Sequence, residues 1–216
     1  MEVELIAFTP EPDIIASVAS LLTHSKSNFK ELKNQDEKKL KRVLRAVIDM
    51  GHTSVVEHAY FTFAISGVSR ALTHQLVRHR IASYSQQSQR YVEQELNYVV
   101  PPSIKKDLRK EYEELIHKIW DFYEELKKHV PIEDARYILP NASCSNIIVS
   151  MNARSLLNFF ELRCCLHAQW EIRKLAWKML SLVRKVAPTI FEKAGPPCKT
   201  KNVCPMNKKK CRWYPK

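Results

Sequence analysis

The chain has 216 residues, which is enough for one domain with a substantial core but too few for two well-developed domains. No apolar run approaches the roughly 18 residues of a membrane span, and the start MEVELIAFTPEPD lacks the regions of a signal peptide. We therefore expect a cytoplasmic protein outside the membrane. The formal charge is +12, but residues 193–216 hold eight Lys or Arg and no acid, so the rest carries only +4.

The first half of the chain predicts two strands and two helices. Residues 3–8 alternate apolar and polar side chains, which is typical of a strand, and a helix is expected over 13–23. Helical periodicity returns over 39–50, where Gly51 can end the helix. Residues 60–66 are aromatic and β-branched, which favours a buried strand.

The next segment is expected to pass from a helix into a loop. Ser69 can cap a helix that runs toward Arg80. Residues 81–90, IASYSQQSQR, follow neither the helical nor the strand period, so they predict an ordered loop.

Two further stretches predict long helices. Between Pro102 and Pro131 the apolar residues step by three and four, which indicates an amphipathic helix with one seam, packed within the fold or against another subunit. Residues 155–186 are apolar on most faces, so we expect a helix at the centre or at a subunit interface. The seam consists of Leu108, Tyr112, Leu115, Ile119, Phe122 and Leu126.

These elements predict an α+β fold: a single domain with a mixed or antiparallel sheet flanked by long helices. Only three glycines occur, which excludes the glycine-rich phosphate cradles of P-loop and Rossmann proteins. Any nucleotide must therefore be held by side chains. We place the catalytic domain at 1–190 and a basic, cysteine-containing tail at 191–216.

The six cysteines are expected to be free thiols, because the chain shows no export signal. In the tail, Cys198, Cys204 and Cys211 are separated by five and six residues, which fits no standard zinc spacing. Three thiolates could still bind a metal with a ligand from elsewhere; otherwise this is a basic, flexible tail. We predict no metal site.

The densest polar cluster spans a helix end and the following loop. Arginine forks match phosphate oxygens, and hydroxyl and amide groups add neutral donors, so the cluster suits a phosphorylated small molecule. The alternative is a solvated basic face. The cluster comprises Gln75, Arg78, His79, Arg80, Ser83, Gln86, Gln87, Ser88 and Arg90.

Four segments resemble the motifs of the flavin-dependent thymidylate synthase family. RHRIASYSQQSQRY resembles its signature of Arg-His-Arg, seven residues and then Ser, here ending at Ser88. GHTSVVEH at 51–58, ARYILP at 135–140, and NARSLLNFFELR with HAQWEIR within 152–173 follow in the family's order. The resemblance covers most of residues 1–187.

The resemblance implies a homotetramer that binds FAD between subunits and converts dUMP to dTMP. Methylenetetrahydrofolate would supply the carbon unit and NADPH would reduce the flavin, with no covalent protein nucleophile. A serine needs an adjacent base to attack, so Ser88 is expected to bind phosphate instead.

The resemblance also implies roles for individual residues. Arg173 is expected to activate the uracil ring by stabilising charge as carbon 5 attacks. His52 and Glu57 should lie near the flavin, and Ser25 is a further flavin candidate. The dUMP residues would be Gln75, Leu76, Val77, Arg78, Gln86, Gln87, Ser88, Gln89, Arg90, Asn146 and Arg173; the FAD residues would be Ser54, Arg78, His79, Arg80, Ile81, Gln86, Glu161, Leu162, Arg163 and His167.

Two departures leave alternatives open. Family members often carry a basic residue where this chain has Asn146, and SLLTHS at 20–25 lacks the arginine and cysteine frequent there. A catalytically silent flavin- or nucleotide-binding relative is therefore one rival. A nucleic-acid-binding protein is another, motivated by the net charge, the arginine-rich block and the lysine-rich tail, although no aromatic-studded RNA-binding strand is present.

Overall fold

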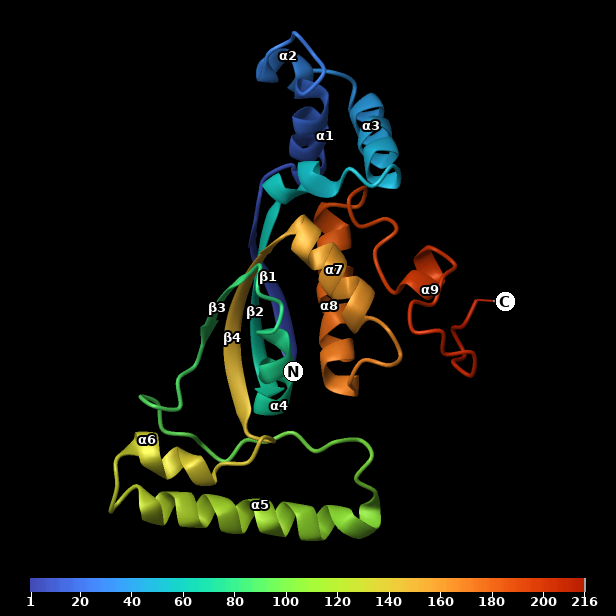
Figure 1. Cartoon of the computed structure of the whole chain (residues 1–216). Coiled ribbons are helices and arrows are strands. Elements are labelled where there is room, and N and C mark those ends of the chain that lie inside the picture. The colour runs from blue at the N-terminus through green and yellow to red at the C-terminus, as the bar shows by residue number, and fades with distance from the viewer. Residues whose placement is uncertain (216) are drawn as a thin grey trace. The chain divides into compact units, whose positions relative to one another are not determined.

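The computed structural model describes residues 1–215 and has the predicted α+β class, with a four-stranded sheet in the order β1-β2-β4-β3 (Figure 1). Main-chain bonds Thr9 N to Tyr60 O (3.0 Å) and Ala153 N to Ala59 O (2.7 Å) show that β2 runs antiparallel to β1 and β4. The strands are β1 (Glu2–Phe8), β2 (Tyr60–Ser69), β3 (Ser83–Gln86) and β4 (Cys144–Asn152).

The chain forms two compact units, which we describe separately. Unit 1 consists of Met1–Glu2, Ile65–Arg78 and Tyr84–Ile148. Unit 2 consists of Val3–Ala64, His79–Ser83 and Val149–Lys216.

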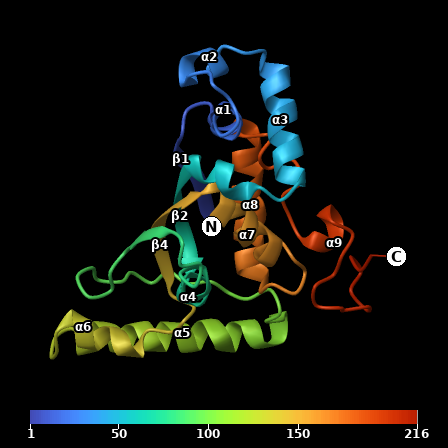
Figure 2. The same cartoon turned by 45° about the horizontal axis from the view of Figure 1, so that its top comes forward.

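Unit 2 contains most of the helices and a phenylalanine-rich core. Helix α1 packs against α2 and α3, and α7 packs against α8 and η1 (Figures 1 and 2). The ring of Phe191 meets Phe61 at 5.4 Å and Phe160 at 5.8 Å, and all three are fully buried. The elements are α1 (Pro12–Leu22), α2 (Phe29–Lys33), α3 (Glu37–Asp49), η1 (Thr53–His58), α7 (Ala153–Arg163), α8 (Trp170–Val186) and α9 (Pro197–Thr200).

Unit 1 contains the long helix α5 with the short α6 and η2 beside it (Figure 1). The buried face of α5 is formed by Ile116, Trp120 and Tyr123. Of the predicted seam, Leu108, Leu115 and Phe122 are 61, 57 and 51% exposed, so this part of the seam has no partner within the described chain. The elements are α4 (Arg70–Leu76), α5 (Lys106–Leu126), α6 (Ile132–Ala135) and η2 (Arg136–Ile138).

The predicted cap at Ser69 is confirmed, because its hydroxyl accepts a hydrogen bond from Leu72 N at 3.0 Å. Helix α4 ends at Leu76, earlier than predicted. Val77, Arg78 and Arg80 are exposed, so continuing the helix would bury little apolar surface.

The predicted loop over 81–90 is wrong in its middle, where β3 adds a strand to the sheet. Main-chain pairing with β4 continues at Gln87 N, which donates to Asn146 O at 2.9 Å. Polar side chains are tolerated on this strand because Gln86 bonds buried hydroxyl groups, so tertiary pairing overrides local propensity.

The single helix predicted over 155–186 is also wrong, because residues 164–169 separate α7 from α8. Gln169 caps α8 by accepting hydrogen bonds from Glu171 N at 2.9 Å and Ile172 N at 3.1 Å. The cap lets the chain turn while both helices keep their apolar faces buried. No helix within residues 1–215 has the length and apolar character needed to cross a membrane.

Candidate functional site

The end of α4 presents the first predicted nucleotide residues in unit 1. Gln75 is half-buried and donates to Ala71 O at 3.3 Å, whereas Arg78 is exposed. Leu76 is buried and Val77 is 38% exposed. The Tyr84 hydroxyl donates to Leu76 O at 2.8 Å, and burial raises the pKa of Tyr84 to about 12, so this donor stays protonated at neutral pH.

We use the name amide cluster for four predicted nucleotide residues with amide side chains, Gln86, Gln87, Gln89 and Asn146. Gln86 donates to the hydroxyls of Thr73 at 3.1 Å and Ser145 at 3.0 Å. Asn146 donates to Gln87 Oε1 at 3.4 Å and accepts from Gly67 N at 3.3 Å. Gln87 and Asn146 are therefore in direct contact, and none of the four amide side chains carries a charge.

Gln89 and Arg90 complete the predicted unit 1 set in different ways. Gln89 is 8% exposed, and its buried Nε2 donor has no hydrogen-bond partner within residues 1–215. Ser88 Oγ accepts from Arg90 N at 3.1 Å. The Arg90 guanidinium instead pairs with Glu133 and lies 5.2 Å from the Tyr91 ring centre.

In unit 2, the predicted flavin residues His79 and Arg163 are in direct contact. Arg163 Nε donates to His79 Nε2 at 3.0 Å, and the His79 ring lies edge-on to Phe159 at 4.9 Å. Burial, and then the charge of Arg163, lower the pKa of His79 to about 4. His79 is therefore neutral at pH 7 and acts as an acceptor.

The other predicted flavin residues of unit 2 are largely exposed. Ile81 and Leu162 are 76 and 53% exposed, and Ser54, Arg80 and His167 are also exposed. Within the described chain, neither Arg80 nor Arg78 of unit 1 has an ion-pair partner.

Arg173, the predicted ring-activating residue, is held at the start of α8. Its Nη1 donates to Leu166 O at 2.7 Å and to Ala168 O at 3.1 Å. A guanidinium has five N–H groups, so the Nη2 and Nε donors remain for a ligand. The two carbonyl groups fix the side chain of Arg173 to the 164–169 turn.

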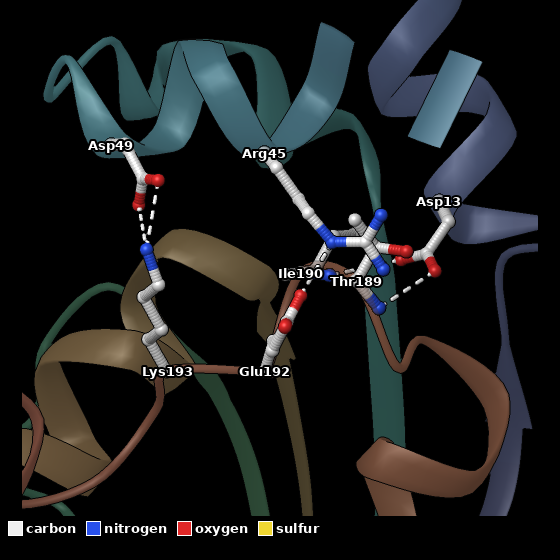
Figure 3. Close-up of polar contacts among 7 residues, drawn as sticks. All are labelled: Asp13, Arg45, Asp49, Thr189, Ile190, Glu192 and Lys193. Carbon is white, nitrogen blue, oxygen red and sulfur yellow. Dashed lines mark hydrogen bonds and ion pairs between the residues drawn. The ribbon is translucent and has the colours of Figure 1, made fainter. Parts of the chain in front are cut away.

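Unit 2 also contains a cavity of about 540 Å³, lined by residues of α3, α7 and the segment 189–201. Arg45 pairs with Glu192 at 2.6 Å, and Lys193 pairs with Asp49 at 2.6 Å (Figure 3). Arg154–Glu57 (2.5 Å) and Lys201–Glu161 are two further pairs, and we call these four the ion-pair cluster.

Besides the ion pairs, a buried carboxylate holds the same segment. Asp13 is 4% exposed and accepts hydrogen bonds from Thr189 N at 2.8 Å and Ile190 N at 3.1 Å (Figure 3). The segment that lines the cavity is therefore anchored to α1 through its main chain.

The tail cysteines lie near Cys165 in unit 2. Burial, and then the thiols of Cys165, Cys204 and Cys211, raise the pKa of Cys198. Trp213 packs edge-on to Trp177 at 6.4 Å, and Lys199 lies 4.6 Å from the centre of the Trp213 ring. All six cysteines are free, and residues 1–215 contain no group of three His, Cys, Asp or Glu arranged to hold a metal.

Sequence reasoning missed Thr73, Ser145 and Tyr84, which hold the predicted residues in place. Thr73 lies inside an apolar helix pattern, and Ser145 lies on a strand that the sequence did not predict. A polar residue on the buried side of a helix was the one available signal, since buried hydroxyls require partners.

Comparison with known proteins places the chain among thymidylate-forming enzymes. Residues 4–189 match the Thy1 family, described as thymidylate synthase complementing protein. The chain is 48% identical to the flavin-dependent thymidylate synthase of Geobacter sulfurreducens, over 95% of this chain and 91% of that protein. It is 45% identical to the enzyme of that name from Clostridium tetani, over 98% and 93%.

A solved structure has a similar fold. The UMP/dUMP methylase PolB from Streptomyces cacaoi, bound with 5-Br dUMP, superposes with a TM-score of 0.79 at 22% identity. The similarity covers 88% of this chain and 93% of that chain.

Proposed function

The chain belongs to the flavin-dependent thymidylate synthase family, and from this premise we propose that it methylates dUMP to dTMP. The match over residues 4–189 carries the proposal. Methylenetetrahydrofolate would provide the carbon unit, and NADPH would provide the electrons. The geometry of the predicted residues supports this reaction at the dUMP residues, at the FAD residues and at Arg173.

The amide cluster and its neighbours would bind dUMP. Neutral amides suit the base and the sugar, because they add hydrogen bonds without charge. The buried and unpartnered Nε2 of Gln89 supplies a donor that a ligand oxygen would satisfy. Arg90 could exchange the exposed carboxylate of Glu133 for a phosphate, since exposed ion pairs contribute little.

The predicted residues of unit 2 fit FAD. Arg80 has a guanidinium group available for a diphosphate, and Arg78 of unit 1 offers the same group. Neutral His79 orients Arg163 by accepting its Nε–H, and the other N–H groups of partly desolvated Arg163 provide donors for the cofactor. When bound, FAD supplies the hydride that completes the methyl group; the role of these side chains is to bind and orient it.

Arg173 would stabilise charge on the uracil ring as carbon 5 attacks the one-carbon unit. Two carbonyl groups fix its guanidinium beforehand, so little reorganisation is needed. A protein nucleophile is not required. Cys164 is buried, and burial raises its pKa to about 12, while Ser88 Oγ accepts a main-chain N–H.

The test is the visible spectrum of the purified protein together with tritium release from dUMP labelled at carbon 5, with methylenetetrahydrofolate and NADPH present. A yellow protein that releases tritium and forms dTMP would support the proposal. A colourless protein that stays inactive with added FAD would refute it, and salt-dependent nucleic-acid binding would then be measured.

We also propose the homotetramer that the family resemblance implies. The exposed residues Leu108, Leu115 and Phe122 recur every seven positions on α5, which supports docking of a second copy along this face. Light scattering of Leu115→Glu/Phe122→Glu should show smaller particles than wild type. Lys110→Glu, at an exposed α5 position, is the control; an unchanged mass in the double variant would place the interface elsewhere.

Two further assignments are proposals. Six free thiols support a reducing compartment such as the cytoplasm. Residues 1–190 would form the catalytic domain, with Phe191 and Ala194 packing the start of the tail onto unit 2.

A further inference from the structure

The side chain of Gln86 is held from one side by two buried hydroxyl groups in unit 1. Thr73 on α4 is fully buried, and Ser145 on β4 is 3% exposed. Gln86 Nε2 lies 3.1 Å from Thr73 Oγ1 and 3.0 Å from Ser145 Oγ. Both distances are those of ordinary neutral hydrogen bonds.

The hydrogen bonding of Thr73 decides which end of the amide faces the hydroxyls. Thr73 has one hydroxyl proton, and it donates this proton to Arg70 O at 3.1 Å. Its oxygen can therefore only accept from Gln86, so the NH₂ end must face Thr73. The reverse amide orientation would place two acceptors against each other, at the cost of an unsatisfied buried group.

This arrangement leaves Gln86 Oε1 as the outward-facing atom. The side chain is half-buried, and Oε1 makes no hydrogen bond within residues 1–215. The carbonyl end is therefore an acceptor whose orientation is fixed before any ligand arrives. Preorganisation of this kind lowers the entropy that binding must lose.

We propose that Thr73 and Ser145 are positioning residues that fix Gln86 Oε1 as the acceptor for a neutral donor on the pyrimidine nucleotide. Two groups of dUMP have this chemistry: the N3–H of the ring and the 3′-hydroxyl. The inference rests on the proposed function, because it assumes that Gln86 contacts dUMP.

The proposal distinguishes glutamine from glutamate at position 86. A carboxylate has no N–H for Thr73 or Ser145, so Thr73 could satisfy it only by giving up Arg70 O. Protonation would restore one donor. Gln86→Glu should therefore bind dUMP more tightly as the pH falls, whereas the wild-type contact contains no titrating group.

The binding experiment uses the flavin-loaded protein and three ligands: dUMP, N3-methyl-dUMP and 2′,3′-dideoxy-UMP. In wild type, one analogue should bind at least about tenfold more weakly than dUMP, which identifies the donor. In Thr73→Val this discrimination should shrink to about twofold, because the amide is free to rotate. Thr73→Ser should restore it.

Thr62→Val is the matched control, because Thr62 shares a 2.8 Å hydroxyl pair with Ser150 in unit 2. It should leave the discrimination unchanged. If Thr73→Val weakens all three ligands equally, or none, the positioning role is wrong. If Thr73→Val does not fold, the dUMP affinity of Gln86→Glu measured against pH tests the proposal instead. An affinity that does not change with pH overturns the proposal.

Failure of the proposed function would look different. A wild-type protein that neither binds dUMP nor releases tritium would overturn both proposals. A wild-type protein that does both, with a Thr73→Val variant that still discriminates as wild type does, would overturn only the role of Thr73.

Discussion

The two units hold their candidate site residues by different physical means. In unit 1 the amide cluster is held by neutral hydrogen bonds to buried hydroxyl and main-chain groups. In unit 2 the predicted flavin residues and the cavity are surrounded by guanidinium, imidazole, ammonium and carboxylate groups. The strength of a neutral hydrogen bond depends on its geometry and little on pH or salt. The strength of a charged contact depends on both pH and salt.

The charged side chains of unit 2 also differ from one another in how deeply they are buried. Arg173 and Asp13 bond to main-chain groups and are half-buried or buried. Lys193 and Arg45 form pairs at 60 and 50% side-chain exposure. Substitutions of these residues should therefore change turnover or the free energy of unfolding by widely different amounts. The order of these changes tests the difference between buried and exposed charged groups.

The largest expected effect is on turnover, in Arg173→Ala. Loss of one preorganised donor near developing charge lowers kcat by about 10²–10³-fold. Arg173→Lys should lose nearly as much, because one ammonium group cannot bond both Leu166 O and Ala168 O and still present a planar fork. Tritium release from labelled dUMP measures this.

Lys174→Ala is the control for Arg173, since Lys174 is the exposed neighbour on α8. It should retain wild-type turnover. A fully active Arg173→Lys variant would mean that charge alone matters at this position, and the fixed geometry would have no catalytic consequence.

The next effect is on stability, in Asp13→Ala. Two buried main-chain N–H groups at 189 and 190 would lose their acceptor, which should lower the free energy of unfolding by about 3 kcal/mol. Asp13→Asn keeps one acceptor oxygen and should lose about half as much. Urea denaturation measures both; equal losses would show that the carboxylate charge, rather than hydrogen bonding, anchors the segment.

Local patterns in the sequence predicted the elements that depend on local chemistry. The strand at 3–8, the helices near 13–23 and 39–50, and the cap at Ser69 are all present. The strand at 83–86 was missed because its polar side chains find partners only after β4 pairs with it. The break at 164–169 was missed because apolar residues continue on both sides of it.

The candidate site residues were predicted from one dense polar cluster and from motif resemblance, and the structure adds what holds them. Arg163 beside His79 could not be read from residues that are 84 positions apart. Neither could the hydroxyl pair behind Gln86, since Ser145 is 59 positions away. Contacts of this range depend on tertiary packing, which no local period encodes.

A smaller effect is expected on the pH dependence of stability, through the titration of His79. Its folded pKa of about 4 lies below the ordinary value of 6.5, so the unfolded chain binds more protons between these values. Stability should therefore fall as the pH falls through this window. Allowing for partial solvent exposure, we expect a loss of about 1 kcal/mol between pH 7 and pH 5.

His79→Gln isolates this contribution, because glutamine can accept from Arg163 but does not titrate in this range. Its unfolding free energy should depend less on pH than that of wild type. His167→Gln, at an exposed position, should follow the wild-type profile. Identical profiles for all three proteins would mean that other groups control the acid sensitivity.

The smallest effect is expected in Lys193→Ala, although Lys193 lies only three residues from Ile190. Its two bonds to Asp49 are short, at 2.6 and 2.8 Å, but the pair is exposed on both sides, so solvation offsets most of the attraction. The free energy of unfolding should change by less than about 0.5 kcal/mol, and less still in high salt. A loss as large as that of Asp13→Ala would mean that the ion-pair cluster holds the segment cooperatively, and the distinction between buried and exposed charge in unit 2 would fail.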